Sequence, residues 1–276
     1  MGDYLRPRGL EEALQALTRP FTVLAGGTDF YPARVGRTVT EDVLDITGIP
    51  DLRGISAGPE GWRLSAMTTW SELVEADLPA LFDGLKQAAC EVGGRQIQNA
   101  GTLAGNICNA SPAADGVPAL LALDAEVEVA SHAGRRRVPL QDFITGVRQT
   151  ALQAGELVVA LHVPRPRREA RSAFLKLGAR RYLVISIAMA SAVLEIADGK
   201  VAAARIAVGS CSPVARRLFD LERALAGAPV DATLGDRVES AHLAPLAPID
   251  DVRGSAVYRQ EAVLVLLRRL LQGFAP

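Results

Sequence analysis

The 276-residue chain has little of what metal centres and disulfide frameworks require. Its three cysteines, Cys90, Cys108 and Cys211, lie far apart and form no C-x-x-C pair. This spacing excludes the usual zinc sites and iron–sulfur clusters, and free thiols are typical of a reducing compartment. We therefore expect no metal site in this chain.

Charge of one sign and long apolar runs are also scarce. The formal net charge is −1, which predicts no binding to nucleic acid or to an anionic membrane surface. No run reaches the roughly 20 apolar residues that span a membrane. The start, M-G-D-Y-L-R-P, lacks the apolar segment of a signal peptide. The sequence thus predicts a cytoplasmic protein without a membrane span.

Side-chain arrangements that catalyse reactions directly are missing as well. His132, His162 and His242 show no metal-ligand spacing, and no nucleophile motif, catalytic triad or carboxylate pair is recognisable. We expect no catalytic residue. If the protein is an enzyme, a bound cofactor carries the chemistry.

Apolar periodicity predicts mixed helices and strands in two parts, with the boundary at the Pro- and Arg-rich residues 164–168. Before it we expect helices at residues 10–17, 78–92 and 116–123, and strands at 21–24, 43–46, 62–66, 125–131, 136–140 and 157–163. After it we expect strands at 172–177, 186–196 and 200–208, then helices at 214–225, 233–241 and 254–271. Asp198-Gly199 is a typical hairpin turn.

Two stretches rich in small residues lie between these elements. The first is A-G-G-T-D at residues 25–29. The second, N-A-G-T-L-A-G-N-I-C-N-A-S-P-A-A-D at residues 99–115, suits neither a helix nor an alternating strand. Glycine-rich loops expose backbone N–H groups that bind phosphate oxygens, so two of them predict a pyrophosphate held from both sides. The alternative is that each is a connecting turn whose polar residues cap the backbone.

Two charged residues are further candidates for ligand binding. Lys176 stands alone in an apolar strand, F-L-K-L-G. Strand alternation would point it into a cleft or out to the surface, and a buried ammonium group needs an anionic or acceptor partner. Asp115 offers a carboxylate for a ribose hydroxyl or a ring N–H group.

These stretches resemble the flavin subunit of the molybdenum hydroxylases, the group of xanthine dehydrogenase and carbon monoxide dehydrogenase, over nearly the whole chain. Residues 25–29 are similar to the family's first FAD pyrophosphate loop, and G-T-L-A-G-N at residues 101–106 is similar to the second. The run at residues 109–115 continues that motif. The segment D-D-V-R-G-S followed by Tyr258 and Arg259 resembles the family's C-terminal signature.

The resemblance implies a set of FAD-binding residues. They comprise the two loops with their flanks, a nucleotide-binding Asp, two apolar flavin contacts and a lysine beside the isoalloxazine ring. In this sequence they are Val23, Leu24, Ala25, Gly26, Gly27, Thr28, Asp29, Phe30, Val92, Gly101, Thr102, Leu103, Ala104, Gly105, Asn106, Asp115, Val158 and Lys176.

The sequence departs from the family pattern at two places. Ala104 replaces the first glycine of the usual pair in the second loop, which fits if this residue keeps a negative φ. Some members carry an aromatic residue that shields the flavin after the lysine strand. Here the only nearby aromatic, Tyr182, stands two positions too early.

The resemblance also implies the architecture and the function. We expect an α+β chain: a PCMH-type FAD-binding fold of two subdomains, residues 1–57 and 58–168, then a small α+β domain of antiparallel sheet and helices, residues 169–276. The chain would be the FAD subunit of a heterotrimeric molybdenum hydroxylase. A large partner would carry the molybdenum–pterin cofactor and a small one the [2Fe–2S] clusters, and FAD would pass electrons to an acceptor such as NAD+. Two alternatives stay open: a stand-alone flavoprotein oxidoreductase of the same fold, and a flavin-free assembly subunit.

Overall fold

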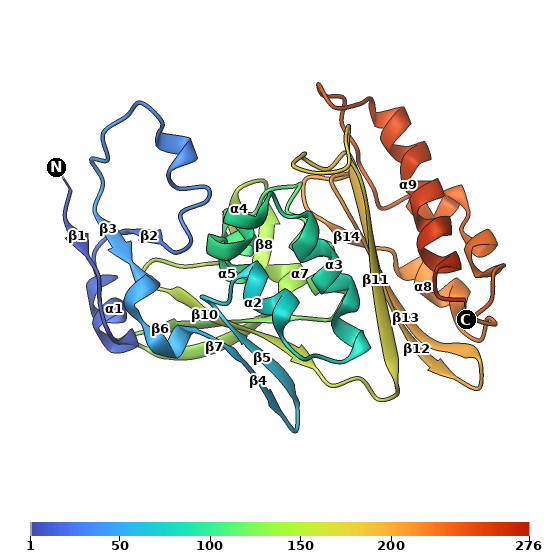
Figure 1. Ribbon diagram of the computed structural model, residues 1–276, viewed down its shortest axis with the longest axis horizontal. Helices are drawn as coiled ribbons and strands as arrows, with labels where there is room; N and C mark the ends of the chain where they lie inside the picture. The colour runs from blue at the N-terminus through green and yellow to red at the C-terminus, as the bar shows by residue number, and fades with distance from the viewer. Residues whose placement is uncertain (1, 276) are drawn as a thin grey trace.

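The computed structural model describes residues 2–275 and arranges three main sheets along its long axis, with helices between and beside them (Figure 1). The first sheet is parallel, in the order β1-β3-β2, and packs with helix α1 on an apolar cluster that also contains Ala130, Leu157 and Val159 of the second sheet. Its elements are β1 (Tyr4–Leu5), α1 (Leu10–Ala16), β2 (Thr22–Leu24) and β3 (Val43–Asp45).

The second sheet is antiparallel and has five strands in the order β4-β5-β10-β6-β7. Its strands are β4 (Ile55–Gly58), β5 (Gly61–Ser65), β6 (Glu126–Ser131), β7 (Gly134–Pro139) and β10 (Leu157–Pro164). The helices packed with it are α2 (Trp70–Glu75), α3 (Asp83–Glu91), α4 (Arg95–Ala100), α5 (Leu103–Asn109), α6 (Gly116–Ala122) and α7 (Leu140–Phe143). A small ribbon of β8 (Ile144–Gly146) and β9 (Gln149–Thr150) follows.

The third sheet, β11-β12-β13-β14, is antiparallel and lies between two layers of helices (Figure 1). Helices α8 and α9 cover one face, and α3 and α6 pack on the other. The elements are β11 (Ala170–Leu177), β12 (Ala188–Ala197), β13 (Lys200–Gly209), β14 (Arg216–Arg217), α8 (Phe219–Leu225) and α9 (Ala256–Gln272).

Apolar packing joins the third sheet to the rest of the molecule. Phe174, Met189, Val193 and Ala207 project from it into the cluster that also buries Trp70. The opposite face of the sheet forms a separate cluster with α8 and α9. Burial on both faces accounts for the near-continuous apolar run in β12.

The architecture confirms the expected α+β class, including the final antiparallel sheet with helices. The domain boundaries at 57/58 and 168/169 stay predictions. Within residues 2–275 no helix is both long and apolar enough to cross a membrane. No group of three or more His, Cys, Asp or Glu side chains in that range is placed to hold a metal ion.

Three local expectations were wrong. The small-residue stretch contains helix α5, which starts because the Thr102 hydroxyl accepts a hydrogen bond from Gly105 N at 3.0 Å. Residues 214–225 contain the short strand β14 before a shorter helix, α8. Residues 233–241 form only 3₁₀ turns, at Leu234–Arg237 and Ser240–Leu243.

Candidate functional site

The first glycine loop follows the C-terminal end of β2. Gly27 adopts the left-handed conformation, with φ of 73°, and its carbonyl accepts a hydrogen bond from Tyr31 N at 3.1 Å. This turn favours glycine, because other residues rarely adopt positive φ. Within residues 2–275, the backbone N–H groups of Gly26, Gly27 and Thr28 have no hydrogen-bond acceptor. The loop therefore presents three donors to an anionic ligand.

The second glycine loop lies directly against the first. A Cβ atom added to Gly26 would lie 1.9 Å from the carbonyl oxygen of Ala100, and one added to Gly101 would lie 3.4 Å from Thr28 Oγ1. Only a residue without a side chain fits at Gly26, whereas the 3.4 Å at Gly101 is an ordinary van der Waals contact. The structure thus brings together the two stretches that the sequence analysis singled out.

Helix α5 forms the wall of the second loop. Its first residue is tied to the segment before α2, because Leu103 N donates to Thr68 O at 3.0 Å. Ala104 is buried inside α5 and has a negative φ. Alanine therefore adopts the backbone conformation of this position without strain. Replacement of the usual glycine is therefore compatible with the backbone.

Asn106 carries a buried polar atom that the described residues leave unsatisfied. Its Oδ1 is inaccessible to solvent and has no hydrogen-bond partner. It lies beside Gly116 and Trp70, since a Cβ on Gly116 would lie 3.0 Å from Asn106 Oδ1 and 2.5 Å from the Trp70 ring. Buried acceptors without a donor are rare in folded proteins and point to a ligand group. The N–H donors, the side-chain-free contact and this acceptor together fit a dinucleotide such as FAD.

Asp115 and Lys176 lie beyond α5 and bind each other. Lys176 Nζ is 2.7 Å from Asp115 Oδ2 and donates to Glu91 O at 3.2 Å, and the lysine side chain is only 5% exposed. Ser186 Oγ donates to Asp115 Oδ1 at 2.5 Å. Burial raises the pKa of the Asp115 carboxyl, against Lys176 and Ser186, which lower it. Asp115 is thus the anionic partner that a buried Lys176 requires.

The remaining predicted residues occupy unlike settings. Val92 is half-buried at the end of α3, next to the Glu91 carbonyl that Lys176 contacts. Val158 is 3% exposed inside the apolar core of the five-stranded sheet. Phe30 lies under the Arg34 guanidinium, 3.8 Å from its ring centroid, and Val23 is exposed. Their contact with FAD stays a prediction, as it does for every residue of the predicted set.

The sequence analysis missed the role of the C-terminal signature and of Ser186. Arg259 is 3% exposed and donates to Ile187 O at 2.6 Å, Ser210 O at 2.9 Å and Asp251 Oδ1 at 2.6 Å. It therefore holds the chain at Ile187, the neighbour of Ser186. The D-D-x-R-x-S-x-x-Y-R pattern was the available signal, but only Asp251 among the partners of Arg259 lies within it, and the carbonyls of Ile187 and Ser210 are far away in the sequence.

Tyr182 and Leu183 lie in an exposed loop between β11 and β12. Tyr182 is 56% exposed, and the Arg181 guanidinium lies 5.1 Å from its ring centroid. Leu183 leans on the start of α4, because a Cβ on Gly94 would lie 3.0 Å from Leu183 Cδ2. This loop therefore borders the segment that leads into the second glycine loop.

Comparisons with known proteins match both halves of the chain. Residues 1–166 match the family described as the FAD binding domain in molybdopterin dehydrogenase, and residues 173–274 match the CO dehydrogenase flavoprotein C-terminal domain. The chain is 31% identical over 276 residues to the carbon monoxide dehydrogenase medium chain of Afipia carboxidovorans, covering 98% of this chain and 95% of that one. It is 30% identical over 279 residues to the xanthine dehydrogenase FAD-binding subunit of Escherichia coli O157:H7, covering 98% and 94%.

Two solved structures share this fold over nearly the whole chain. A chain of reconstituted CO dehydrogenase from Oligotropha carboxidovorans superposes with a TM-score of 0.90 at 30% identity, covering 100% of this chain and 99% of that one. A chain of quinoline 2-oxidoreductase from Pseudomonas putida 86 superposes with a TM-score of 0.87 at 26% identity, covering 99% and 96%.

Proposed function

The chain belongs to the FAD-binding subunits of the molybdopterin dehydrogenases, and from this premise we propose how it serves as the medium subunit of an oxidoreductase complex. Membership confirms the family, the fold class and the FAD cofactor expected from the sequence. We propose that the two glycine loops hold the FAD pyrophosphate between them. The observation that carries this proposal is the contact of Gly26 with the Ala100 carbonyl.

The backbone of the two loops would bind the pyrophosphate. Gly26, Gly27 and Thr28 offer N–H groups without an acceptor in the described chain, and Thr28 adds a hydroxyl. Phosphate oxygens accept such hydrogen bonds at about 3 Å, a distance that side chains at Gly26 or Gly101 would prevent.

The charged pair would border the flavin. FAD bound here would supply the redox chemistry of electron transfer. Lys176 and Asp115 neutralise each other in a buried setting, so they place a fixed dipole, not a net charge, beside the ring. Such a preorganised dipole tunes the flavin without reorganisation of solvent.

We propose that the partners are a large molybdenum–pterin subunit and a small [2Fe–2S] subunit in a heterotrimer. The relatives' names support this, since one is the medium chain of a carbon monoxide dehydrogenase and one solved relative is a Cu,Mo-CO dehydrogenase. The test is to purify the complex through a tag on this chain and assay molybdenum, iron and FAD. Stoichiometric FAD with both partners supports the proposal, and a yellow protein that carries no partner would favour a stand-alone flavoprotein.

We also propose NAD+ as the electron acceptor. The exposed loop with Arg180, Arg181 and Tyr182 supports this, because arginine binds phosphates and an exposed ring stacks on a base. The measurement is the reoxidation of the substrate-reduced complex by NAD+ and by a neutral dye. A complex that reacts with the dye but not with NAD+ would contradict this part alone.

The three units at residues 1–57, 58–168 and 169–276 are likewise proposed as the working division of the chain. The three main sheets support it: the first lies within residues 1–57, the third within 169–276, and the second, apart from the start of β4, within 58–168. Limited proteolysis with mass spectrometry tests the boundaries, since cuts should concentrate near residues 57 and 168.

A further inference from the structure

Helix α6 is bound at both ends by residues of the third sheet and its flanking elements. At its N-terminal end, Asp115 is the N-cap residue, and Lys176 of β11 binds its carboxylate at 2.7 Å. Ser186, just before β12, donates to the other carboxylate oxygen. The first end of α6 is therefore held by side chains from the C-terminal part of the chain.

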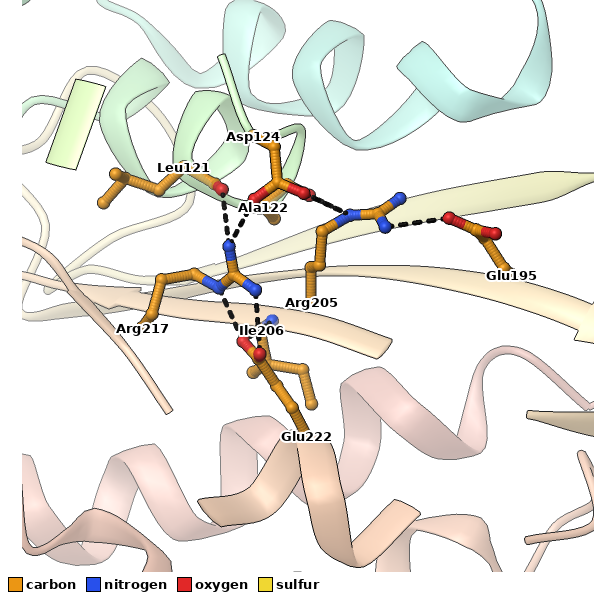
Figure 2. A network of polar contacts seen from close by, with 8 residues as sticks. All are labelled: Leu121, Ala122, Asp124, Glu195, Arg205, Ile206, Arg217 and Glu222. Atoms are coloured by element: carbon orange, nitrogen blue, oxygen red, sulfur yellow. Dashed lines mark hydrogen bonds and ion pairs between the residues drawn. The ribbon is translucent and has the colours of Figure 1, made fainter. Parts of the chain in front are cut away.

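At the other end, two arginines hold the last carbonyls of α6 (Figure 2). Arg205 Nε donates to Ala122 O at 3.0 Å, and Arg217 Nη1 donates to Leu121 O at 3.3 Å. Both arginine side chains are largely buried, at 16% and 11% exposure. Cations at a helix C-terminus also interact favourably with the helix dipole.

Asp124 links both arginines to the turn that ends α6. Ala125 N donates to Leu120 O at 3.0 Å and Asp124 N to Leu121 O at 3.1 Å, which is a Schellman ending. Its left-handed position, usually glycine, is occupied by Asp124 with φ of 52°. The carboxylate lies 2.6 Å from Arg217 Nη1 and 3.3 Å from Arg205 Nε (Figure 2). The strained choice of aspartate at this position is explained by these two contacts.

Two glutamates fix the arginines in turn (Figure 2). Glu222 of α8 binds Arg217 in a bidentate pair at 2.6 and 2.7 Å, and it also accepts from Ile206 N at 2.8 Å. Glu195 of β12 lies 2.8 Å from Arg205. The clamp, defined as Arg205, Arg217 and Asp124, is thus anchored on a helix and on strands, not on mobile loops.

We propose that Arg205, Arg217 and Asp124 are positioning residues for the flavin: they set the position of α6 along its axis, and with it the Asp115–Lys176 pair. This inference rests on the proposed FAD site. A seven-residue helix is about 10 Å long and stiff, so its two ends move together. Displacement at the clamp therefore displaces Asp115.

The third sheet packs on the rest of the molecule without the help of this clamp. Phe174, Met189 and Val193 already insert into the core that contains Trp70. Buried ion pairs add little net stability compared with apolar packing, because desolvation offsets their attraction. The charged, directional contacts of the clamp hold the end of α6 in a fixed geometry.

The test uses the full chain in its purified complex, stripped of FAD and titrated with it. Arg217→Gln is compared with Arg136→Gln, which breaks another bidentate arginine–glutamate pair, to Glu156 at 2.7 Å, away from α6. We expect Arg217→Gln to raise the Kd for FAD about tenfold and to shift the flavin midpoint potential. Arg136→Gln should lower the unfolding temperature of the FAD-free protein to a similar extent and leave both flavin values unchanged.

A second variant, Asp124→Gly, removes the carboxylate but keeps a residue that favours the left-handed turn. Its control is Asp198→Gly, at a hairpin aspartate with φ of 51°. We expect about a threefold rise in Kd for Asp124→Gly and none for the control, since the Asp124 contacts are partly exposed. If wild type binds FAD and both clamp variants match it in Kd and potential, the positioning role is overturned alone. A wild-type complex without flavin overturns the proposed function, and the positioning role with it.

Discussion

The two ends of the proposed FAD site differ in composition: one is formed by backbone groups and the other by side chains. The pyrophosphate end is backbone: glycines packed against a carbonyl, with N–H groups that have no acceptor among residues 2–275. The flavin end is side chains: a buried lysine, an aspartate and a serine that satisfy one another. The first end tolerates almost no added atom, and the second tolerates no lost charge. Each therefore fails in a different way when it is mutated.

Gly26→Val should have the largest effect. Its Cβ would lie 1.9 Å from the Ala100 carbonyl oxygen, so the two loops must separate. We expect FAD affinity to fall by at least about 100-fold, the equivalent of roughly 3 kcal/mol. Flavin content of the purified complex and titration of FAD measure it. Gly58→Val is the control, because an added Cβ there meets nothing within 4 Å. Retention of stoichiometric flavin in Gly26→Val would disprove the placement of the first loop.

Breaking the flavin end should lower stability as well as binding. Lys176→Met leaves the Asp115 carboxyl buried without its cation, which costs about 3–5 kcal/mol. The double variant Asp115→Asn with Lys176→Met should recover most of this loss, because neither charge then remains buried alone. Urea unfolding of wild type, of the single variants Lys176→Met and Asp115→Asn, and of the double variant gives the coupling energy. Additive losses would contradict a direct pair. Arg223→Met, which breaks an exposed pair with Asp220, should cost less than about 1 kcal/mol.

Glu128, a carboxylate outside the site, has a lowered pKa, whereas the pKa of Asp115 is raised. Burial acts to raise the pKa of Glu128, but hydrogen bonds from His162 and Arg135 and the charge of Arg63 lower it to about 2. Since this folded-state pKa lies below the unfolded value of about 4.3, its stabilisation is complete above pH 5 and is lost as the pH falls towards 2. We expect a loss of about 2–3 kcal/mol across that range.

Glu128→Gln should flatten this pH dependence. The measurement is urea unfolding between pH 5 and pH 3 for wild type and variant, with Asp198→Gly as a control that leaves the Glu128 cluster intact. Parallel curves for wild type and Glu128→Gln would show that another group titrates.

Thr102→Ala should have the smallest effect. It removes the hydroxyl that accepts from Gly105 N at the start of α5 and should cost about 1 kcal/mol of stability. FAD affinity should fall only slightly, since the backbone that faces the ligand remains. A loss of binding as large as that of Gly26→Val would mean that the hydroxyl contacts the ligand itself.

The small-residue stretches of the backbone end were identified from the sequence. Asp115 and Lys176 were also identified, each as a separate candidate, but their pairing was not predicted. Glycine pairs and small residues mark a backbone site locally, so both loops could be identified from short stretches. The Asp115–Lys176 pair joins residues 61 positions apart, and its third member, Ser186, has no local signal. Pairings of this kind depend on how the third sheet packs on α6, which periodicity does not predict.

The secondary structure also contains elements that local sequence patterns predict and elements that depend on tertiary packing. The hairpin at Asp198-Gly199 and the long helix α9 follow from turn chemistry and from a long periodic pattern. Helix α5 was not predicted, because glycine and proline lower helix propensity in that stretch. The burial of Leu103 and Ile107, both fully inaccessible, outweighs this local preference.

The contact of Gly26 with Ala100 affects how well the subunit resists degradation in a cell. The first loop extends from the sheet of β1, β2 and β3, whereas the second belongs to the helices around Trp70. A dinucleotide gripped by both would act as a reversible crosslink, adding about 2.7 kcal/mol of stability at 100 times its Kd. Chains that have not yet received the nucleotide would lack this crosslink and would be degraded faster by proteases. Cofactor loading would in this way select which copies survive to enter the complex.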